Sequence, residues 1–242
     1  MQVAPDAAPK RGTERAGQVR RVFSEIAPRY DLLNHVLSLN IDRRWRKAAV
    51  EHLGWERVPE GTYLDACAGT YDLSLALAGR EGFSGRVVAA DFAHPMLAQG
   101  ASKIGRASVA PVCADSLELP FPDAAFDGAT VGFGVRNLAD VRTGLAELRR
   151  VLRPGGRLVV LEFTEPPNRV VRAGYLFYFR RILPVVGRLV SGHQWAYTYL
   201  PESVKEFPAP KELGSLFEQV GFRDVGWRLL TGGIAALHWG TA

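Results

Sequence analysis

From residue 63 onwards, short apolar runs alternate with segments whose apolar residues recur at helical spacing. The apolar runs are typical of buried strands, and the segments between them are typical of helices that cover a sheet. Five strands are predicted in this part of the chain, at Tyr63–Ala66, Arg86–Asp91, Ala110–Ala114, Gly128–Phe133 and Arg157–Phe163. Because strands and helices alternate, we expect a mostly parallel sheet with helices on both faces.

The end of the chain departs from this alternation. After a predicted helix at Lys211–Val220, two apolar runs at Val225–Leu230 and Ile234–Trp239 are separated only by Thr231-Gly232-Gly233. A short glycine-containing link between two such runs is typical of a hairpin. The sequence therefore predicts seven strands, of which the last two form an antiparallel end to the sheet.

The turn after the first predicted strand carries the most informative chemistry. The strand leads into small residues around Gly69, and Asp91 follows about 20 residues later, at the end of the second strand. An acidic residue at this distance from a glycine turn can accept hydrogen bonds from both hydroxyls of a ribose. A plain strand–helix turn with a helix-capping Asp is the alternative for the turn taken alone.

The turn does not match a dinucleotide site. Tyr71 and Ser74 stand where a G-x-G-x-x-G motif would need its further glycines. Asp65 and Asp72 would repel a phosphate, whereas they could receive a cationic sulfonium. The turn therefore favours S-adenosylmethionine as the ligand.

Composition fits an enzyme of this kind. The 242 residues are 47% hydrophobic, enough for one α/β domain, and contain no apolar run of membrane-spanning length or secretory signal. Cys67 and Cys113 are expected to be buried thiols in a reducing cytosol, and no Cys/His spacing predicts a metal site. The net charge of +5 is mild. It could favour an anionic membrane surface, and we expect no nucleic-acid partner.

Segments outside the alternating pattern are expected to surround the ligand. Residues 1–15 are predicted to be a disordered tail and 16–242 a single domain that begins with helices in 16–55. The helices expected in Leu32–Leu53 are predicted to lie across the cofactor cleft. Residues 170–200 are rich in aromatic residues and arginine and are interrupted by Pro184. We interpret this segment as an inserted lid, with ordinary helical packing on the sheet as the alternative.

Several blocks spread from Val19 to the C-terminus resemble the menaquinone/ubiquinone biosynthesis C-methyltransferases. They are Ala27-Pro28-Arg29-Tyr30-Asp31, the Asp65–Asp72 turn, Leu119-Pro120-Phe121-Pro122-Asp123, Phe133-Gly134-Val135-Arg136-Asn137 and Leu230-Thr231-Gly232-Gly233-Ile234. The resemblance implies a Rossmann-like class I methyltransferase fold and S-adenosylmethionine as cofactor. It implies C-methylation of a prenylated quinol, with demethylmenaquinol becoming menaquinol in the menaquinone branch. A methyltransferase of another small molecule or lipid, or a non-catalytic cofactor-binding homologue, is the alternative.

The resemblance also implies site residues. Thr70 matches the threonine of the cofactor turn, Asp91 the ribose acid, and Asp115 and Ser116 the pair beside the adenine, where the family often has Asn-Ala. Gly132 stands where the family can hold a cofactor-contacting serine. The expected cofactor-binding residues are Asp65, Gly69, Thr70, Asp72, Asp91, Phe92, Met96, Asp115, Ser116 and Gly132.

Tyr71 departs from the family pattern, which usually has glycine at this position of the turn. Glycine permits positive φ and close backbone approach, whereas tyrosine is strained there. Three outcomes are open: negative φ with the ring in solvent, a ring packed on the methionine end of the cofactor, or a ring that obstructs the site.

The expected catalytic residues are Arg136, Asn137, His193 and Tyr199. Arg136 is predicted to stabilise the quinol oxyanion directly or through water, since a guanidinium is a poor proton acceptor. Its alternative role is a salt bridge to a neighbouring helix. Asn137 could fix Arg136 or cap the following helix, and capping is favoured. His193 and Tyr199 are lesser candidates for proton transfer.

The acceptor implied by the resemblance carries a lipid tail, so the protein needs a surface that meets the membrane. Residues 172–190 combine apolar bulk with four arginines. We therefore expect a cytoplasmic protein that binds peripherally at the inner face of the membrane. A homodimer is left open.

Overall fold

The computed structural model describes residues 17, 27, 38, 40–178, 181 and 202–242. The predicted tail, most of the helices before residue 42 and most of the predicted lid lie outside these residues. The same holds for Pro184, His193 and Tyr199, whose predicted roles stay predictions.

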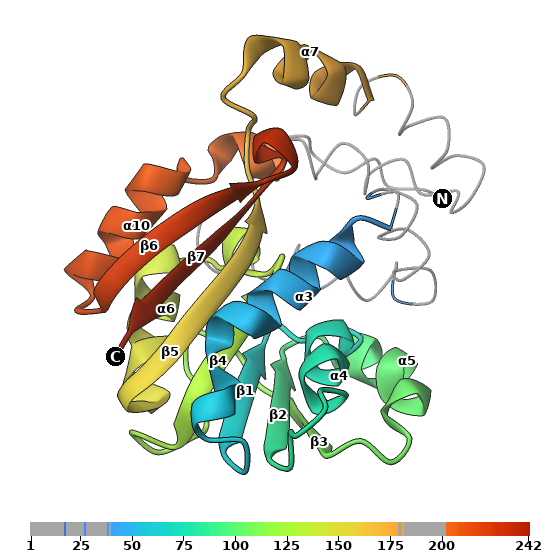
Figure 1. The fold of residues 1–242 in the computed structure, drawn as a ribbon, viewed down its shortest axis with the longest axis vertical. Coiled ribbons are helices and arrows are strands. Elements are labelled where there is room, and N and C mark those ends of the chain that lie inside the picture. The colour runs from blue at the N-terminus through green and yellow to red at the C-terminus, as the bar shows by residue number, and fades with distance from the viewer. Residues whose placement is uncertain (1–16, 18–26, 28–37, 39, 179–180, 182–201) are drawn as a thin grey trace.

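The centre of the fold is a seven-stranded sheet in the order β3-β2-β1-β4-β5-β7-β6 (Figure 1). The strands are β1 Thr62–Ala66, β2 Arg86–Asp91, β3 Val109–Cys113, β4 Phe126–Gly132, β5 Leu152–Phe163, β6 Arg223–Leu230 and β7 Ala235–Thr241. Strands β1 to β5 pair in parallel, and β7 runs antiparallel to both β5 and β6. The predicted mostly parallel sheet with an antiparallel C-terminal pair is confirmed.

The start of β5 differs from the prediction. The strand was expected to begin at Arg157, but it begins at Leu152 and includes Pro154, Gly155 and Gly156. Hydrogen bonds from Gly155 N to Ala242 O (3.0 Å) and from Ala242 N to Gly156 O (2.9 Å) extend the sheet to this point. A shift in register between Phe126 and Gly128 of β4 absorbs the irregular geometry. These contacts come from the far end of the chain, so local turn signals could not reveal them.

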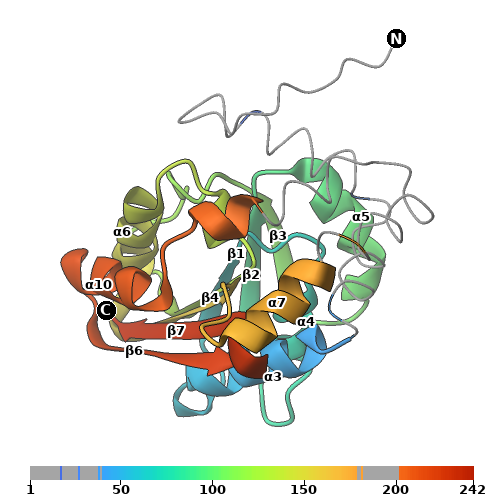
Figure 2. The same ribbon diagram turned by 90° about the horizontal axis from the view of Figure 1, so that it is seen from above.

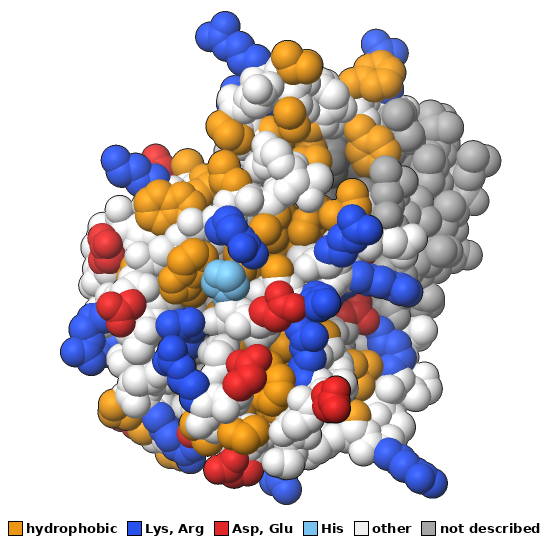
Figure 3. All heavy atoms as spheres, viewed as in Figure 1, with side chains coloured by type: hydrophobic (Ala, Val, Ile, Leu, Met, Phe, Trp, Pro, Cys, Tyr) orange, Lys and Arg blue, Asp and Glu red, His pale blue; other side chains and the backbone are white. Residues whose placement is uncertain are grey.

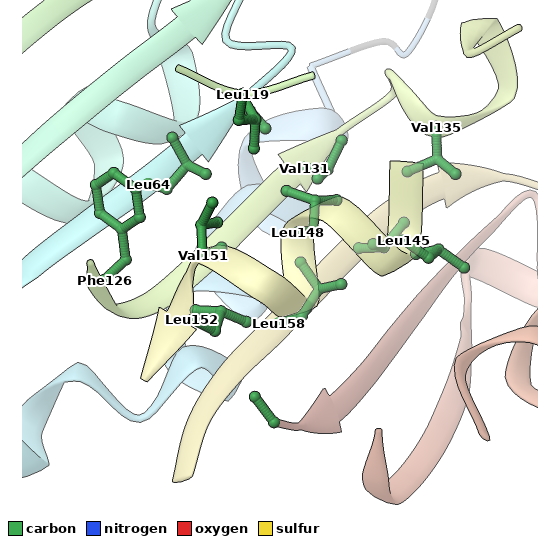
Figure 4. Close-up of a cluster of buried hydrophobic side chains, with 14 of the residues drawn as sticks. Leu64, Leu119, Phe126, Val131, Val135, Leu145, Leu148, Val151, Leu152 and Leu158 are labelled. Carbon is green, nitrogen blue, oxygen red and sulfur yellow. The ribbon is translucent and has the colours of Figure 1, made fainter. Parts of the chain in front are cut away.

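Helices cover both faces of the sheet (Figure 2). They are α3 Asp42–Leu53, α4 Asp72–Ala78, α5 His94–Ile104, α6 Val141–Val151, α7 Arg169–Phe177 and α10 Pro210–Gln219. Neighbouring residues of one strand enter different cores, as period-two alternation requires. Leu158 packs with α6 and α10, whereas Val159 packs with α3 and α4. Figure 4 shows the first of these cores, with Leu145 and Leu148 directed at the sheet.

Helix α3 lies on the sheet rather than across the cofactor cleft, which corrects the prediction for this part of the N-terminal segment. Its buried stripe, Trp45, Ala49, Val50 and Leu53, has the spacing of one helix face and packs in the core beside β5. Figure 1 shows the helix running over the strands. No helix in the described part of the chain has the length and apolar character needed to cross a bilayer.

His238 of β7 gives the fold a predicted pH dependence. The ring is 1% exposed, Nε2 lies 3.0 Å from Pro210 O, and burial lowers the pKa of His238 to about 4. In the unfolded chain the histidine is protonated below about pH 6.5, whereas in the folded chain it stays neutral down to about pH 4. The free energy of unfolding therefore falls as the pH drops from 6.5 towards 4. Relative to His238→Phe, the wild type should lose about 2 kcal/mol of unfolding free energy between pH 7 and 4.5. Urea titrations of both proteins at each pH give the difference between their unfolding free energies, in which the contributions of the other titrating groups cancel. A difference that does not change with pH would contradict the lowered pKa of His238.

Candidate functional site

A pocket lies at the carboxyl ends of the parallel strands, where β1 and β4 are neighbours but their connections run to opposite sides of the sheet. Ligands of open α/β sheets bind at this kind of position. The pocket is partly open to solvent. Its lining residues are Cys67, Gly69, Asp91, Phe92, Met96, Asp115, Ser116, Leu117, Gly132, Phe133, Gly134, Asn137, Leu138 and Ala139.

Asp91 ends β2 inside this pocket and is 6% exposed. One carboxylate oxygen accepts a hydrogen bond from Gly69 N (2.9 Å) and the other from Ala93 N (2.8 Å). Burial raises the pKa of Asp91, and these two backbone donors oppose the rise. A carboxylate oxygen has two lone pairs, so each oxygen can accept a further bond from a ligand hydroxyl.

Asp65 and Asp72 were expected to contact the cofactor, but neither is among the lining residues. Asp65 accepts hydrogen bonds from Ser74 N, Ser74 Oγ and Thr130 Oγ1, and burial raises its pKa to about 6. Asp72 pairs with Lys103 Nζ at 2.7 Å and with Arg46 Nη2 at 3.2 Å. Both carboxylates therefore hold the turn and helix α4 in place from outside the pocket.

Thr70 was also expected at the cofactor. It is 2% exposed and does not line the pocket, whereas Gly69 of the same turn does. The turn therefore presents its backbone to the pocket at Gly69, which has a φ of 56°.

The expected pair Asp115 and Ser116 lines the pocket beyond β3. Asp115 Oδ1 accepts from Leu117 N at 2.9 Å, and Ser116 Oγ lies 3.5 Å from the sulfur of Cys67. Cys67 faces the pocket with a pKa raised to about 12 by burial. The prediction that both thiols are buried is wrong for Cys113, which is exposed on the edge strand β3.

Gly132, at the end of β4, lines the pocket as predicted, and its missing side chain has a packing reason. A Cβ built at Gly132 would lie 2.6 Å from Leu73 Cδ1 of helix α4. A serine at this position would therefore require Leu73 to move. In this chain the position is occupied by the close packing of α4 on β4, so it offers no side chain to contact the cofactor.

Arg136 forms a buried ion pair next to the pocket. Its Nη1 donates to Glu162 Oε1 at 2.6 Å and to Phe133 O at 2.5 Å, and its backbone N–H donates to Glu162 Oε2 at 3.2 Å. Arg136 is 7% exposed and Glu162 1%, and neither is among the residues that line the pocket. Arg136 therefore forms a salt bridge, as its alternative role required, although this partner lies on strand β5 and not on a helix.

Asn137 lines the pocket and does not cap the following helix, contrary to the prediction. Its Nδ2 donates to Phe133 O at 3.3 Å, the carbonyl that Arg136 also contacts. Helix α6 is capped instead by Asp140, whose carboxylate accepts from Thr143 N at 2.7 Å. Arg136 and Asn137 thus meet at one carbonyl at the end of β4.

Tyr71 follows none of the three outcomes considered for it. Its φ is 71°, as the glycine of the family would permit, yet its ring is 1% exposed and is not among the lining residues. The ring is buried between the turn and helix α5, and its hydroxyl donates to Leu97 O at 2.7 Å. The side chain therefore does not obstruct the pocket.

Sequence reasoning missed several residues of the site. The lining also includes Cys67, Leu117, Phe133, Gly134, Leu138 and Ala139. Glu162 was missed as the partner of Arg136, although an acidic residue inside the apolar run of residues 158–163 was a detectable signal. A carboxylate in a strand that is buried on both faces requires a partner.

The charged side chains of the pocket suit S-adenosylmethionine better than a dinucleotide. Among the fourteen described residues that line it, Asp91 and Asp115 are the charged ones, and none is a lysine or arginine. Two carboxylates would repel a pyrophosphate, whereas they suit hydroxyls, an adenine amino group and a cationic sulfonium. Phe92 and Met96 add apolar surface for a flat ring.

Comparison with known protein structures finds the same fold in solved structures over almost the whole chain. A possible histamine N-methyltransferase of Thermotoga maritima superposes with a TM-score of 0.65 over 92% of this chain and 99% of its own, at 17% identity. The [4+2]-cyclase SpnF superposes with a TM-score of 0.69 over 97% of this chain and 98% of its own, at 16% identity. At these identities the likeness shows the fold alone.

Sequence comparison is more specific. The demethylmenaquinone methyltransferase of Thermus thermophilus is 52% identical over 221 residues, which cover 90% of this chain and 99% of the relative. The ubiquinone/menaquinone biosynthesis C-methyltransferase UbiE of Geobacter sulfurreducens is 45% identical over 94% of this chain and 90% of the relative. The model of the ubiE/COQ5 methyltransferase family matches residues 10–242. With this match and the pocket described above, the chain belongs to the ubiE/COQ5 family of S-adenosylmethionine-dependent methyltransferases.

Proposed function

We propose that the protein methylates a ring carbon of demethylmenaquinol and so forms menaquinol. The observation that carries this proposal is the 52% identity, over almost the whole length of both chains, to a demethylmenaquinone methyltransferase. The buried Tyr71 ring argues against the non-catalytic alternative, because it leaves the pocket open.

The cofactor is assigned to the pocket through its polar residues. Asp91 would accept hydrogen bonds from the two ribose hydroxyls, and Asp115, with Ser116 next to it, would accept from the adenine amino group. Phe92 and Met96 would supply apolar surface for the adenine, and Gly69 and Gly132 would let the backbone approach the rest of the cofactor. S-adenosylmethionine supplies an electrophilic methyl group whose positive charge disappears on transfer, so a metal has no necessary part in the reaction.

The protein must make the ring carbon nucleophilic and hold it in line with the methyl group, at roughly 3–3.5 Å. Electron density reaches that carbon when a quinol hydroxyl ionises or partly ionises. Arg136 stabilises the developing oxyanion directly or through a water, and Glu162 and Phe133 O fix its guanidinium. Asn137 lies at the pocket wall beside it. A ring proton then leaves to restore aromaticity, and His193 and Tyr199 stay the predicted candidates for accepting it.

The lipid tail of the acceptor is assigned to the surface around α7. Val170 and Phe177, which lie two turns apart, are 80% and 61% exposed, and Arg169 is exposed next to Val170. Figure 3 shows hydrophobic and basic side chains gathered over this helix. Apolar side chains beside arginines suit an anionic bilayer surface. The protein thus binds the membrane peripherally while the quinol ring enters the pocket. The homodimer stays a prediction, because a single chain does not test it.

Replacing Val170 and Phe177 with serine should weaken binding to anionic vesicles and lower turnover of a long-chain quinol more than that of a short-chain analogue. Each buried apolar side chain contributes roughly 1.5–3 kcal/mol to membrane binding, less for partial insertion. Val58→Ser is the matched control, since Val58 is also an exposed apolar residue but lies before β1. Vesicle sedimentation and parallel assays with both substrates measure the effect. Equal losses on the two substrates would contradict the membrane assignment.

Quinone extraction from a bacterial strain that lacks its own demethylmenaquinone methyltransferase tests the proposed function. Expression of this chain should convert the accumulated demethylmenaquinone to menaquinone. Accumulation that persists despite folded protein would contradict the proposal, and methylation of a benzoquinone instead would assign the other branch of the family.

A further inference from the structure

Tyr71 is a strained residue with a fully buried side chain. Its backbone occupies the left-handed region, at φ 71° and ψ 18°, where a side chain is disfavoured. Its ring packs with Ala89 of β2 and Leu97 of α5. Burial raises the pKa of Tyr71 to about 12, so the hydroxyl remains a donor at ordinary pH. The hydroxyl bond to Leu97 O, at 2.7 Å, ties the turn to the second turn of α5.

Gly100 of α5 makes room for this contact. A Cβ built there would lie 2.7 Å from Tyr71 Cδ2, 2.8 Å from Thr70 Cα and 2.9 Å from Thr70 O. The ring and the turn backbone therefore both rest directly on the helix at this glycine. Tyr71 and Gly100 are complementary in shape, the larger residue in the turn facing the smallest one in the helix.

The two elements that Tyr71 joins carry different parts of the pocket lining. The turn supplies Cys67 and Gly69, whereas Phe92 and Met96 come from the segment that enters α5 and from its first turn. Met96 directly precedes Leu97, whose carbonyl accepts the Tyr71 hydroxyl bond. A displacement of α5 away from the turn would therefore change the width of the pocket.

We propose that Tyr71 is a positioning residue for the cofactor, which clamps helix α5 to the glycine turn and fixes the separation between Gly69 and Met96. The inference rests on the assignment of this pocket to S-adenosylmethionine. Tyr71 acts through α5 and through the turn, without a place of its own in the pocket lining. Gly100 is the residue of α5 that makes the clamp possible.

Tyr71→Phe tests the clamp, and Tyr63→Phe is its matched control. Tyr63 is also a buried tyrosine whose hydroxyl donates to backbone carbonyls, Trp55 O and Val58 O, but it lies near the start of β1, away from the pocket. Both variants should lose similar thermal stability. Tyr71→Phe alone should raise the dissociation constant of S-adenosylmethionine about fivefold, as expected for one lost hydrogen bond, with less than about twofold change in kcat at saturating cofactor. Amide exchange in α5 should accelerate in Tyr71→Phe only.

Equal dissociation constants in the two variants would show that Tyr71 is ordinary core packing and would overturn the proposal. Calorimetry needs no quinol acceptor, so a failure of the proposed methylation reaction would leave this result interpretable. An error in locating the cofactor would be recognised separately, because Asp91→Ala would then also leave the dissociation constant unchanged.

A double-mutant cycle tests the pairing with Gly100. Gly100→Ala should weaken cofactor binding in the wild type, because the new methyl group meets the Tyr71 ring. The same substitution should cost less in a Tyr71→Gly background, where only the contacts with Thr70 remain. Identical losses of cofactor affinity in both backgrounds would show that the Tyr71 ring does not determine how closely α5 approaches the turn at Gly100.

Discussion

Asp91→Ala is expected to weaken binding of S-adenosylmethionine by roughly one to two orders of magnitude, the largest effect predicted for a single residue of the cofactor pocket. Two hydrogen bonds between a carboxylate and ribose hydroxyls would be lost, each contributing about 1.5 kcal/mol or more. The carboxylate sits at the end of β2 with both oxygens anchored by backbone N–H groups, so it is held ready for the ligand. Calorimetric titration with S-adenosylmethionine measures the loss.

Asp127→Ala is the matched control for this experiment. Asp127 also accepts from a backbone N–H, that of Thr62 at 2.8 Å, and also lies on a sheet strand, but near the start of β4 rather than at its carboxyl end. Its replacement should lower stability and leave cofactor affinity unchanged. If Asp91→Ala affects affinity no more than Asp127→Ala does, the ribose assignment is wrong.

Arg136→Lys is expected to lower turnover at least tenfold, which corresponds to an activation free energy raised by about 1.4 kcal/mol or more. Cofactor affinity should stay the same. Lysine keeps the charge but cannot hold Glu162 and Phe133 O in the planar geometry of a guanidinium. The positive charge would then be misplaced relative to the quinol oxygen. Arg136→Ala is a poorer test, because a buried Glu162 without its partner could cost about 3–5 kcal/mol of stability.

The control is Arg150→Lys. Arg150 also bonds to carboxylates and carbonyls, among them Glu147 Oε1 at 2.6 Å and Leu119 O at 3.1 Å, but it lies on α6 rather than beside the carboxyl end of β4. Steady-state assays with a soluble quinol and calorimetry with the cofactor separate the two steps. Turnover of Arg136→Lys equal to that of Arg150→Lys would assign Arg136 a purely structural role.

Most of the fold could be predicted from the sequence because its signals are local. Each buried parallel strand is an apolar run, each helix has an apolar face, and the hairpin link carries two glycines. The errors occur where distant residues decide. Strand β5 starts earlier than predicted because Ala242 forms backbone hydrogen bonds with Gly155 and Gly156. Cys113 is exposed because β3 lies at an edge of the sheet.

The predictions for the candidate site also failed where distant residues decide the outcome. Asp91 was predicted from its place at the end of a strand, whereas Asp115 and Gly132 were predicted from the family resemblance. All three line the pocket because the carboxyl ends of parallel strands meet at one edge of the sheet. The role of Asp65 was not, since its partners Ser74 and Thr130 come from two other elements. Tyr71 was misjudged because the space for its ring is created by Gly100, which no pattern near the turn indicates.

The reaction proposed for this protein is methyl transfer from S-adenosylmethionine to a ring carbon of demethylmenaquinol. The most direct measurement incubates the purified protein with a short-chain demethylmenaquinol and S-adenosylmethionine labelled in its methyl group, and analyses the product by mass spectrometry and NMR. We predict one label per molecule, attached to the unsubstituted ring carbon. A label on a quinol oxygen, or no transfer by folded protein that binds the cofactor, would contradict the proposed C-methylation.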